Sequence, residues 1–234
     1  MINKEFLQRE AQSIGVALND EALNRFDLFA ELLVAWNQKM NLTAITEPMD
    51  ITVKHFLDSI TPLSYFDIEN GAEMIDVGCG AGFPSLPILI ARPDIKITFF
   101  DALEKRLKFI DAVLDELGLD GDPVHGRAED FGNMPKFREQ YDYAVTRAVA
   151  PLNILAEYCL PFVKVGGSYI SMKGADDETA LGANAIQELG GEIEQIISLK
   201  LSNGYRRNLI SVRKISQTSP KYPRKSKKIA RQPL

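Results

Sequence analysis

Apolar residues recur at every third or fourth position between residues 3 and 38, with charged residues between them. This spacing places the apolar side chains on one face of a helix. Asn19 and Asp20 interrupt the pattern, and Asn followed by acidic residues is typical of a helix start. The pattern predicts two amphipathic helices that bury one face against the rest of the protein.

A third helical pattern covers residues 51–63 and places His55 and Asp58 three positions apart on one face. Such a pair is most often a structural contact. Because it lies just ahead of the glycine-rich loop described below, both side chains are also candidates for substrate binding. We expect residues 1–66 to form a helical extension packed on the core.

From residue 74 onward the pattern alternates between short apolar runs and amphipathic segments. This alternation is typical of an α/β fold with a parallel sheet and helices on both faces. Residues 67–219 are expected to form this core, with seven strands, the last two antiparallel around a turn at Gly204–Tyr205, and with Gly166–Gly167 as a turn before the fifth strand. The predicted strands are 74–77, 95–100, 123–125, 141–146, 168–172, 192–201 and 208–214; the predicted helices are 86–91, 104–117, 152–160 and 177–189.

The first predicted strand runs into a loop with glycine at alternate positions, Gly78, Gly80 and Gly82. Glycine accepts positive φ, so the loop is expected to bring backbone N–H groups against a ligand, and the following helix N-terminus favours an anion. The loop indicates a nucleotide-like cofactor, although glycine-rich strand ends also occur as plain turns.

The spacing in this loop disfavours a dinucleotide. A dinucleotide loop has the pattern G-x-G-x-x-G, but here Phe83 or Ser85 occupies the third position. Asp76 precedes the glycines, and its carboxylate would repel a pyrophosphate but attract an amino group. S-adenosylmethionine has such an amino group, which makes it the better candidate.

Further candidates follow at the ends of later strands. Asp101 ends the second strand, where such folds bind a ribose diol, and a carboxylate accepts two hydroxyl hydrogen bonds. Residues 126–130 are either a seat for adenine or a simple polar turn. Arg147 and Lys173 lie at successive strand tips facing the ligand crevice, where they are candidates to bind RNA phosphate, a base edge or the cofactor carboxylate.

The composition is that of an ordinary globular protein: 234 residues, 45% hydrophobic and 25% charged. The sequence lacks a run of about 20 apolar residues and a signal-peptide core, so we expect a cytoplasmic protein. Its two cysteines and two histidines are far apart, and no metal site is predicted.

Charge is unevenly distributed. The net charge is −5, but residues 220–234 contain six cations and no acid. A basic tail on an acidic body is expected to contact a phosphate backbone, although a solvated, disordered tail is an equally common outcome. Arg224 and Lys225 of this tail are candidates for phosphate contacts, and the Arg206–Arg207 pair outside the tail is a further candidate.

Several motifs, in order and spacing, resemble one bacterial family: the small-subunit (16S) ribosomal RNA guanine-N7 methyltransferases, the RsmG (GidB) family. The resemblance covers nearly the whole chain. It is carried by Asn41-Leu-Thr-Ala-Ile-Thr, His55-Phe-Leu-Asp-Ser, Asp76-Val-Gly-Cys-Gly-Ala-Gly-Phe-Pro, Asp101-Ala-Leu-Glu-Lys-Arg, Arg127-Ala-Glu and Thr146-Arg-Ala.

The resemblance implies a Rossmann-like class I methyltransferase that transfers a methyl group from S-adenosylmethionine to N7 of guanine 527. It implies cofactor contacts at Gly78, Phe83, Ala128, Glu129 and Arg147, alongside Asp76, Gly80, Gly82 and Asp101. Its partner would be small-subunit ribosomal RNA or the assembling 30S subunit, and the protein would act as a monomer. The tail departs from the family, since Lys227-Lys228-Ile229 replaces a Gly-x-Pro.

Guanine N7 has an in-plane lone pair and no proton, so no base is needed and no catalytic residue is predicted. Three alternatives remain open. The first is a methyltransferase for a small molecule, a protein or another RNA. The second is a nicotinamide oxidoreductase, which the missing glycine disfavours. The third is a non-catalytic RNA-binding assembly protein, which the intact loop and Asp101 disfavour.

Overall fold

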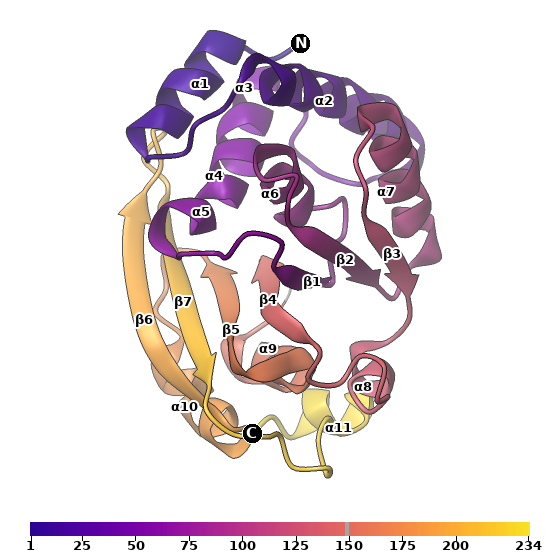
Figure 1. The fold of residues 1–234 in the computed structure, drawn as a ribbon, viewed down its shortest axis with the longest axis vertical. Coiled ribbons are helices and arrows are strands. Elements are labelled where there is room, and N and C mark those ends of the chain that lie inside the picture. Colours follow the sequence, from indigo (N-terminus) through magenta and orange to yellow (C-terminus); the bar gives the residue numbers. More distant parts are fainter. Residues whose placement is uncertain (148–149) are drawn as a thin grey trace.

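A computed structural model describes residues 1–147 and 150–234, which leaves Ala148 of the Thr146-Arg-Ala motif outside the described residues. Seven strands of the described chain form one sheet in the order β3-β2-β1-β4-β5-β7-β6 (Figure 1). β1 to β5 are parallel, and β7 is antiparallel to β5 and β6. This arrangement confirms the predicted fold class. The strands are β1 Glu73–Val77, β2 Lys96–Asp101, β3 Asp122–His125, β4 Tyr141–Arg147, β5 Val163–Lys173, β6 Gly191–Lys200 and β7 Arg206–Lys214.

Helices cover both faces of this sheet (Figure 1). One apolar cluster joins α1, α2, α6 and α7 to the sheet, and a second joins α9 and α10 to it. The helices are α1 Lys4–Ser13, α2 Asp20–Met40, α3 Pro48–Asp50, α4 Asp58–Ile60, α5 Pro62–Tyr65, α6 Ser85–Ala91, α7 Glu104–Leu117, α8 Ala128–Phe131, α9 Leu152–Cys159, α10 Thr179–Glu188 and α11 Ser226–Arg231.

The two predicted N-terminal helices are present as α1 and α2. The side chain of Asn19 accepts a hydrogen bond from the Ala22 N–H and so caps α2 as expected. On the buried face of α2, the Phe29 ring lies 5.4 Å from both Phe56 and Phe83, between ring centroids. Phe83 belongs to the glycine loop, so the N-terminal helices share their apolar core with that loop.

Two predicted elements differ from the structure. Gly166 and Gly167 do not form a turn but lie inside β5, which begins at Val163. The register against β4 shifts there, and a Cβ on Gly167 would lie 2.4 Å from the Asp142 carbonyl oxygen. Glycine at this position permits the close approach of the two backbones at a bulge. Because glycine is common in turns as well as in bulges, the sequence alone did not distinguish the two.

The helix predicted over residues 51–63 is not a regular α-helix. Ile51–Leu57 is π-helical, with the Asp58 N–H directed to the carbonyls of Val53 and His55, and short α-helices follow. The wider turn changes which side chains share a face. Apolar periodicity alone does not distinguish a π-turn from an α-turn.

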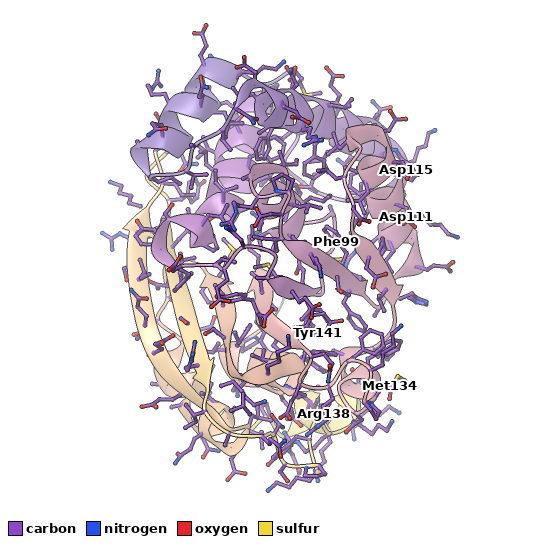
Figure 2. All side chains as sticks on the ribbon, in the orientation of Figure 1. Phe99, Asp111, Asp115, Met134, Arg138 and Tyr141 are labelled. Carbon is purple, nitrogen blue, oxygen red and sulfur yellow. The ribbon has the colours of Figure 1, made fainter. Side chains whose placement is uncertain are left out.

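The basic tail is not a solvated arm. It contains α11, and the side chain of Ile229 is fully buried. The Arg138 guanidinium donates to the carbonyl oxygens of Tyr222, at 2.8 Å, and Thr218. Figure 2 labels Arg138 beside this final segment. The tail therefore packs on the body of the protein.

No helix within the described ranges combines the length and the apolar character needed to cross a bilayer.

Phe29→Ala is expected to lower the free energy of unfolding by about 3–5 kcal/mol, because it removes a buried ring from the aromatic cluster that joins α2 to the glycine loop. Urea denaturation of both proteins measures the change. Leu181→Ala, at a half-exposed position on α10, is the matched control and is expected to change stability by less than about 0.5 kcal/mol. Equal effects of the two substitutions would contradict this role of Phe29.

Candidate functional site

A cavity of about 210 Å³ lies at the carboxyl ends of β1 and β2, where open α/β sheets bind ligands. Four of the predicted cofactor residues lie on its wall: Gly78, Asp101, Ala128 and Glu129. The remaining lining residues are Val77, Phe100, Ala102, Gly126, Arg127, Ala150, Leu155 and Tyr158. The structure therefore brings together residues that are 51 positions apart in the sequence.

Asp101 ends β2 inside this cavity, with only 3% of its side chain exposed. Its carboxylate accepts hydrogen bonds from the Gly80 N–H at 2.9 Å and the Leu103 N–H at 2.8 Å, and the Arg106 guanidinium lies 3.2 Å away. A carboxylate has about four acceptor sites, so these donors leave room for about one more. Binding both hydroxyls of a ribose would require the half-exposed Arg106 to move aside.

The glycine loop differs from its expected role. Gly78, Gly80 and Gly82 all have positive φ, as predicted, but their N–H groups are not free for a ligand. Gly78 and Cys79 both donate to the Phe100 carbonyl, Gly80 donates to Asp101, and Gly82 donates to the Cys79 carbonyl. The expectation of bare N–H groups is wrong because the turn bonds to the neighbouring strand β2. The loop offers space for a ligand because its glycines have no side chains.

Asp76 is fully buried in β1 and does not line the cavity. One carboxylate oxygen, Oδ2, accepts from the Ser85 hydroxyl at 2.5 Å and lies 3.4 Å from the Ser85 N–H, at the start of α6. The other oxygen, Oδ1, is buried without a hydrogen-bond partner among the described residues. Burial raises the pKa of Asp76 to about 7. Such an unpaired acceptor is suited to an ammonium group or a water.

A second group of predicted residues lies together next to the glycine loop. The His55 ring stacks on Phe83, with 4.2 Å between centroids, and the Arg147 guanidinium lies 4.8 Å from the same Phe83 ring. Arg147 Nη2 lies 3.1 Å from His55 Nδ1, and Thr43 Oγ1 lies 2.8 Å from His55 Nε2. Because a guanidinium only donates, Nδ1 must accept and Nε2 must carry the proton. Burial and the nearby Arg147 charge lower the pKa of His55 to about 3.

Asp58 is the anion of this group. Its buried carboxylate accepts from Arg207 Nε at 3.0 and 3.1 Å, and Arg147 Nη1 lies 3.5 Å from it. Arg147 also donates to the Lys54 and His55 carbonyls. Burial lowers the pKa of Arg147, an effect that the Asp58 and Asp76 carboxylates oppose. The group joins the tips of β4 and β7 to the N-terminal helices.

The other predicted cations lie elsewhere. Lys173 is almost fully buried and pairs with Glu178 at 3.0 Å, so it does not face the crevice as a free cation. Arg206 is exposed on the β6–β7 hairpin. Arg224 and Lys225 pair with Glu157 and Asp130, which belong to α9 and α8. The sequence did not anticipate these partners because each lies many residues away.

Sequence reasoning missed the wall that α9 contributes to the cavity through Leu155 and Tyr158. These residues read as the apolar face of an amphipathic helix, a pattern that indicates burial without indicating a ligand. Their three-residue spacing places both on one side of α9, and Tyr158 is the only signal that could have marked this side, since its ring is apolar and its hydroxyl polar.

The cavity fits S-adenosylmethionine by its chemistry. Phe100, Leu155 and Tyr158 offer apolar surface for an adenine ring, and Asp101 offers a hydroxyl acceptor. Outside the cavity lining, Asp76 Oδ1 is a buried acceptor that has no partner among the described residues. Within residues 1–147 and 150–234, no cluster of three or more His, Cys, Asp or Glu is placed to hold a metal ion.

Comparison with known proteins gives consistent matches over the chain. The family described as rRNA small subunit methyltransferase G matches residues 22–210. A protein of Alkaliphilus oremlandii named ribosomal RNA small subunit methyltransferase G is 46% identical over 235 residues, covering 99% of this chain and 98% of its own length. A protein of Acetivibrio thermocellus with the same name is 47% identical over 234 residues, covering 99% and 96%.

Solved structures support the fold at much lower identity. A SAM-dependent methyltransferase from Aquifex aeolicus has a TM-score of 0.55 at 15% identity, covering 76% of this chain and 97% of its own. TrmN from Thermus thermophilus has a TM-score of 0.52 at 17% identity, covering 70% and 53%. At these identities the likeness concerns the fold.

Asp76→Asn is expected to increase the free energy of unfolding relative to the wild type as the pH rises from about 4 to 7. Burial raises the folded pKa to about 7 from its ordinary value of 3.8. Between these two values the carboxyl is ionised in the unfolded state but protonated in the folded state, so rising pH destabilises the wild type but not the variant. The gain is on the order of a few kcal/mol and constant above pH 7. Chemical denaturation at several pH values measures it, and His55 titrates in both proteins. A pH-independent difference would contradict the raised pKa.

Proposed function

The chain belongs to the family described as rRNA small subunit methyltransferase G, and from that membership we propose that it methylates N7 of guanine 527 in 16S ribosomal RNA. As a member of this family it is a methyltransferase, and S-adenosylmethionine is its cofactor. The choice of base and of atom follows from the motif resemblance and belongs to the proposal.

One observation carries the proposal: Gly78, Asp101, Ala128 and Glu129 lie on one cavity at the carboxyl ends of the strands. Each was selected from sequence as a cofactor contact, and no two of the first three are closer than 23 positions in the chain. We propose that the adenosine part of the cofactor occupies this cavity. Asp76, Gly80, Gly82, Phe83 and Arg147 would then shape the adjoining loop rather than line the cavity.

The chemistry requires little from the protein besides alignment. The bound cofactor supplies an electrophilic methyl group on a sulfonium. Guanine N7 already carries the attacking lone pair, so the residues at this edge have to hold the base in line and exclude water. Orientation of this kind contributes up to about 7–11 kcal/mol in well-aligned model reactions.

The charges at this edge suit a cationic product. N7-methylation leaves a positive charge on the purine ring, which an unbalanced cation nearby would destabilise. Both strand-tip cations are paired with carboxylates: Arg147 with Asp58, and Lys173 with Glu178. We propose that these cations position elements of the site and do not act on the reacting atoms.

The β6–β7 hairpin is the proposed first contact for RNA. It lies at the same edge of the sheet as the carboxyl end of β5, because Lys173 pairs with Asn208. Tyr205 is 50% exposed there, with Lys54 Nζ 5.1 Å from its ring centroid, and Lys200 and Arg206 are exposed beside it. Exposed aromatics flanked by cations bind unpaired nucleotides by stacking and by charge.

An unpaired guanine is also what the reaction needs. N7 lies in the deep, narrow groove of A-form RNA, which side chains do not reach. We propose that the substrate is a loop guanine of small-subunit RNA, free or in the assembling 30S subunit, and that the reaction takes place in the cytoplasm.

The test is to map N7-methylguanine in 16S RNA from cells with and without this protein. Position 527 is expected to lose its methyl group in cells without it and to regain it with the wild-type gene. Asp101→Ala is expected not to restore it, and the purified variant should bind S-adenosylhomocysteine about 5–150-fold more weakly, from the loss of a charged hydrogen-bond acceptor worth about 1–3 kcal/mol. Methylation that persists without the protein would overturn the proposed substrate.

Arg206→Ala is expected to weaken binding of 16S RNA and to reduce the slope of log affinity against log salt by about 0.7–0.9, the contribution of one phosphate contact. Filter binding at several salt concentrations measures it. Lys105→Ala removes an exposed cation from α7, which lies away from this hairpin (Figure 1), and is expected to leave the slope unchanged. Identical slopes for wild type and Arg206→Ala would exclude the hairpin as a phosphate contact.

A further inference from the structure

Two helices that contact the tail also form one wall of the cavity. α8 contributes Ala128 and Glu129 to the lining, and α9 contributes Leu155 and Tyr158. These helices belong to separate stretches of the chain, and α8 is only four residues long. Their relative position sets the width of the cavity on this side.

The link to α9 is a buried ion pair. Glu157, next to Tyr158 in sequence, is 0% exposed, so its carboxylate requires a partner inside the protein. Among the described residues, Arg224 alone donates to this carboxylate: its Nε donates at 2.8 Å, its Nη2 at 2.6 Å, and its backbone N–H at 2.8 Å. A fork-shaped guanidinium matches both carboxylate oxygens, and such a pair fixes direction as well as distance.

The link to α8 runs through the segment that follows it. The Asn133 amide donates to the Glu129 carbonyl at 3.0 Å and to the Pro223 carbonyl at 3.3 Å, so one side chain bridges α8 and the tail. Lys225 pairs with Asp130 of α8 at 2.8 Å. A Cβ on Gly132 would lie 3.1 Å from Pro223 Cγ, which shows how closely the tail approaches this turn.

The tail is itself anchored on both sides of these contacts. Before them, Arg138 donates to the Gly132 and Tyr222 carbonyls at 2.8 Å and so joins the turn after α8 to the tail. After them, Ile229 of α11 is fully buried. Because the tail is held at both ends, the contacts that it makes between them restrict the movement of α8 and α9.

We propose that residues 222–231 act as a strap that fixes α8 against α9 and thereby sets the shape of the cofactor cavity. Arg224 and Glu157 are its positioning residues, since neither lines the cavity. Arg224 and Lys225 then serve cofactor binding through their contacts with α9 and α8, whereas composition alone indicated RNA. This inference rests on the proposed placement of the cofactor in the cavity.

Calorimetry with S-adenosylhomocysteine tests the strap on the full-length protein. Arg224→Ala is expected to raise the dissociation constant at least tenfold, because the unpaired Glu157 carboxylate moves toward water and carries α9 with it. Lys228→Ala, at an exposed cation of α11, is the matched control and is expected to leave the constant unchanged. The double variant Arg224→Met with Glu157→Met removes the buried carboxylate together with its partner, and it is expected to recover most of the affinity. If Arg224 acted on the ligand directly through its charge, the double variant would bind as weakly as Arg224→Ala.

Hydrogen exchange of the wild type gives a second readout that requires no variant and remains decisive if Arg224→Ala fails to fold. Coupling between two sites is reciprocal, so saturating S-adenosylhomocysteine is expected to slow exchange at the tail amides of Ile229 and Gln232 several-fold. Amides of α1, which does not contact the cavity wall, are expected to be unaffected.

The outcomes separate the two proposals. Wild-type binding together with unchanged affinity in Arg224→Ala, or unchanged tail exchange on ligand binding, would overturn the strap alone. A wild-type protein that binds no S-adenosylhomocysteine would overturn the proposed function and the strap with it.

Discussion

A single buried carboxylate, Asp58, joins the tips of two strands beside the glycine loop. It is 2% exposed and lies between Arg207 of β7 and Arg147 of β4. Removal of one partner from such a buried cluster typically costs about 3–5 kcal/mol, because the remaining charge has no compensation. Arg147 in turn fixes the tautomer of His55, whose ring packs on Phe83 of the glycine loop. The N-terminal helices are therefore part of the site, since the loop and two strand tips take their positions from them.

The fold was largely predictable because its signals are local. Alternation of apolar runs and amphipathic segments predicted the mostly parallel sheet, and Asn19 marked the start of α2. The errors arose where a local signal has two structural outcomes. Gly166 and Gly167 read as a turn but form a bulge, since glycine serves both conformations. The π-helical segment at Ile51–Leu57 was invisible because apolar periodicity does not report hydrogen-bond register.

The candidate site was predictable in part, for a related reason. Strand ends indicated Gly78 and Asp101, and the family resemblance added Ala128 and Glu129. All four lie on one cavity, because the carboxyl ends of parallel strands meet at one edge. What the residues bond to was not predictable. The loop N–H groups read as ligand donors, yet the Phe100 carbonyl and Asp101 accept them. Lys173 read as a free cation, yet Glu178 pairs with it. Which partner such a group finds depends on which distant segments pack together in the folded protein, and a local sequence pattern does not show this.

The Glu157–Arg224 pair has a consequence for the order of events during protein synthesis. The two residues are 67 positions apart, so the ribosome releases Glu157 well before Arg224. Chains begin to fold from their N-terminal side while translation continues. The Glu157 carboxylate must therefore stay hydrated until residue 224 emerges, and α9 cannot settle into its final burial before then. Packing of this wall of the cavity is thus completed only after residue 224 has left the ribosome.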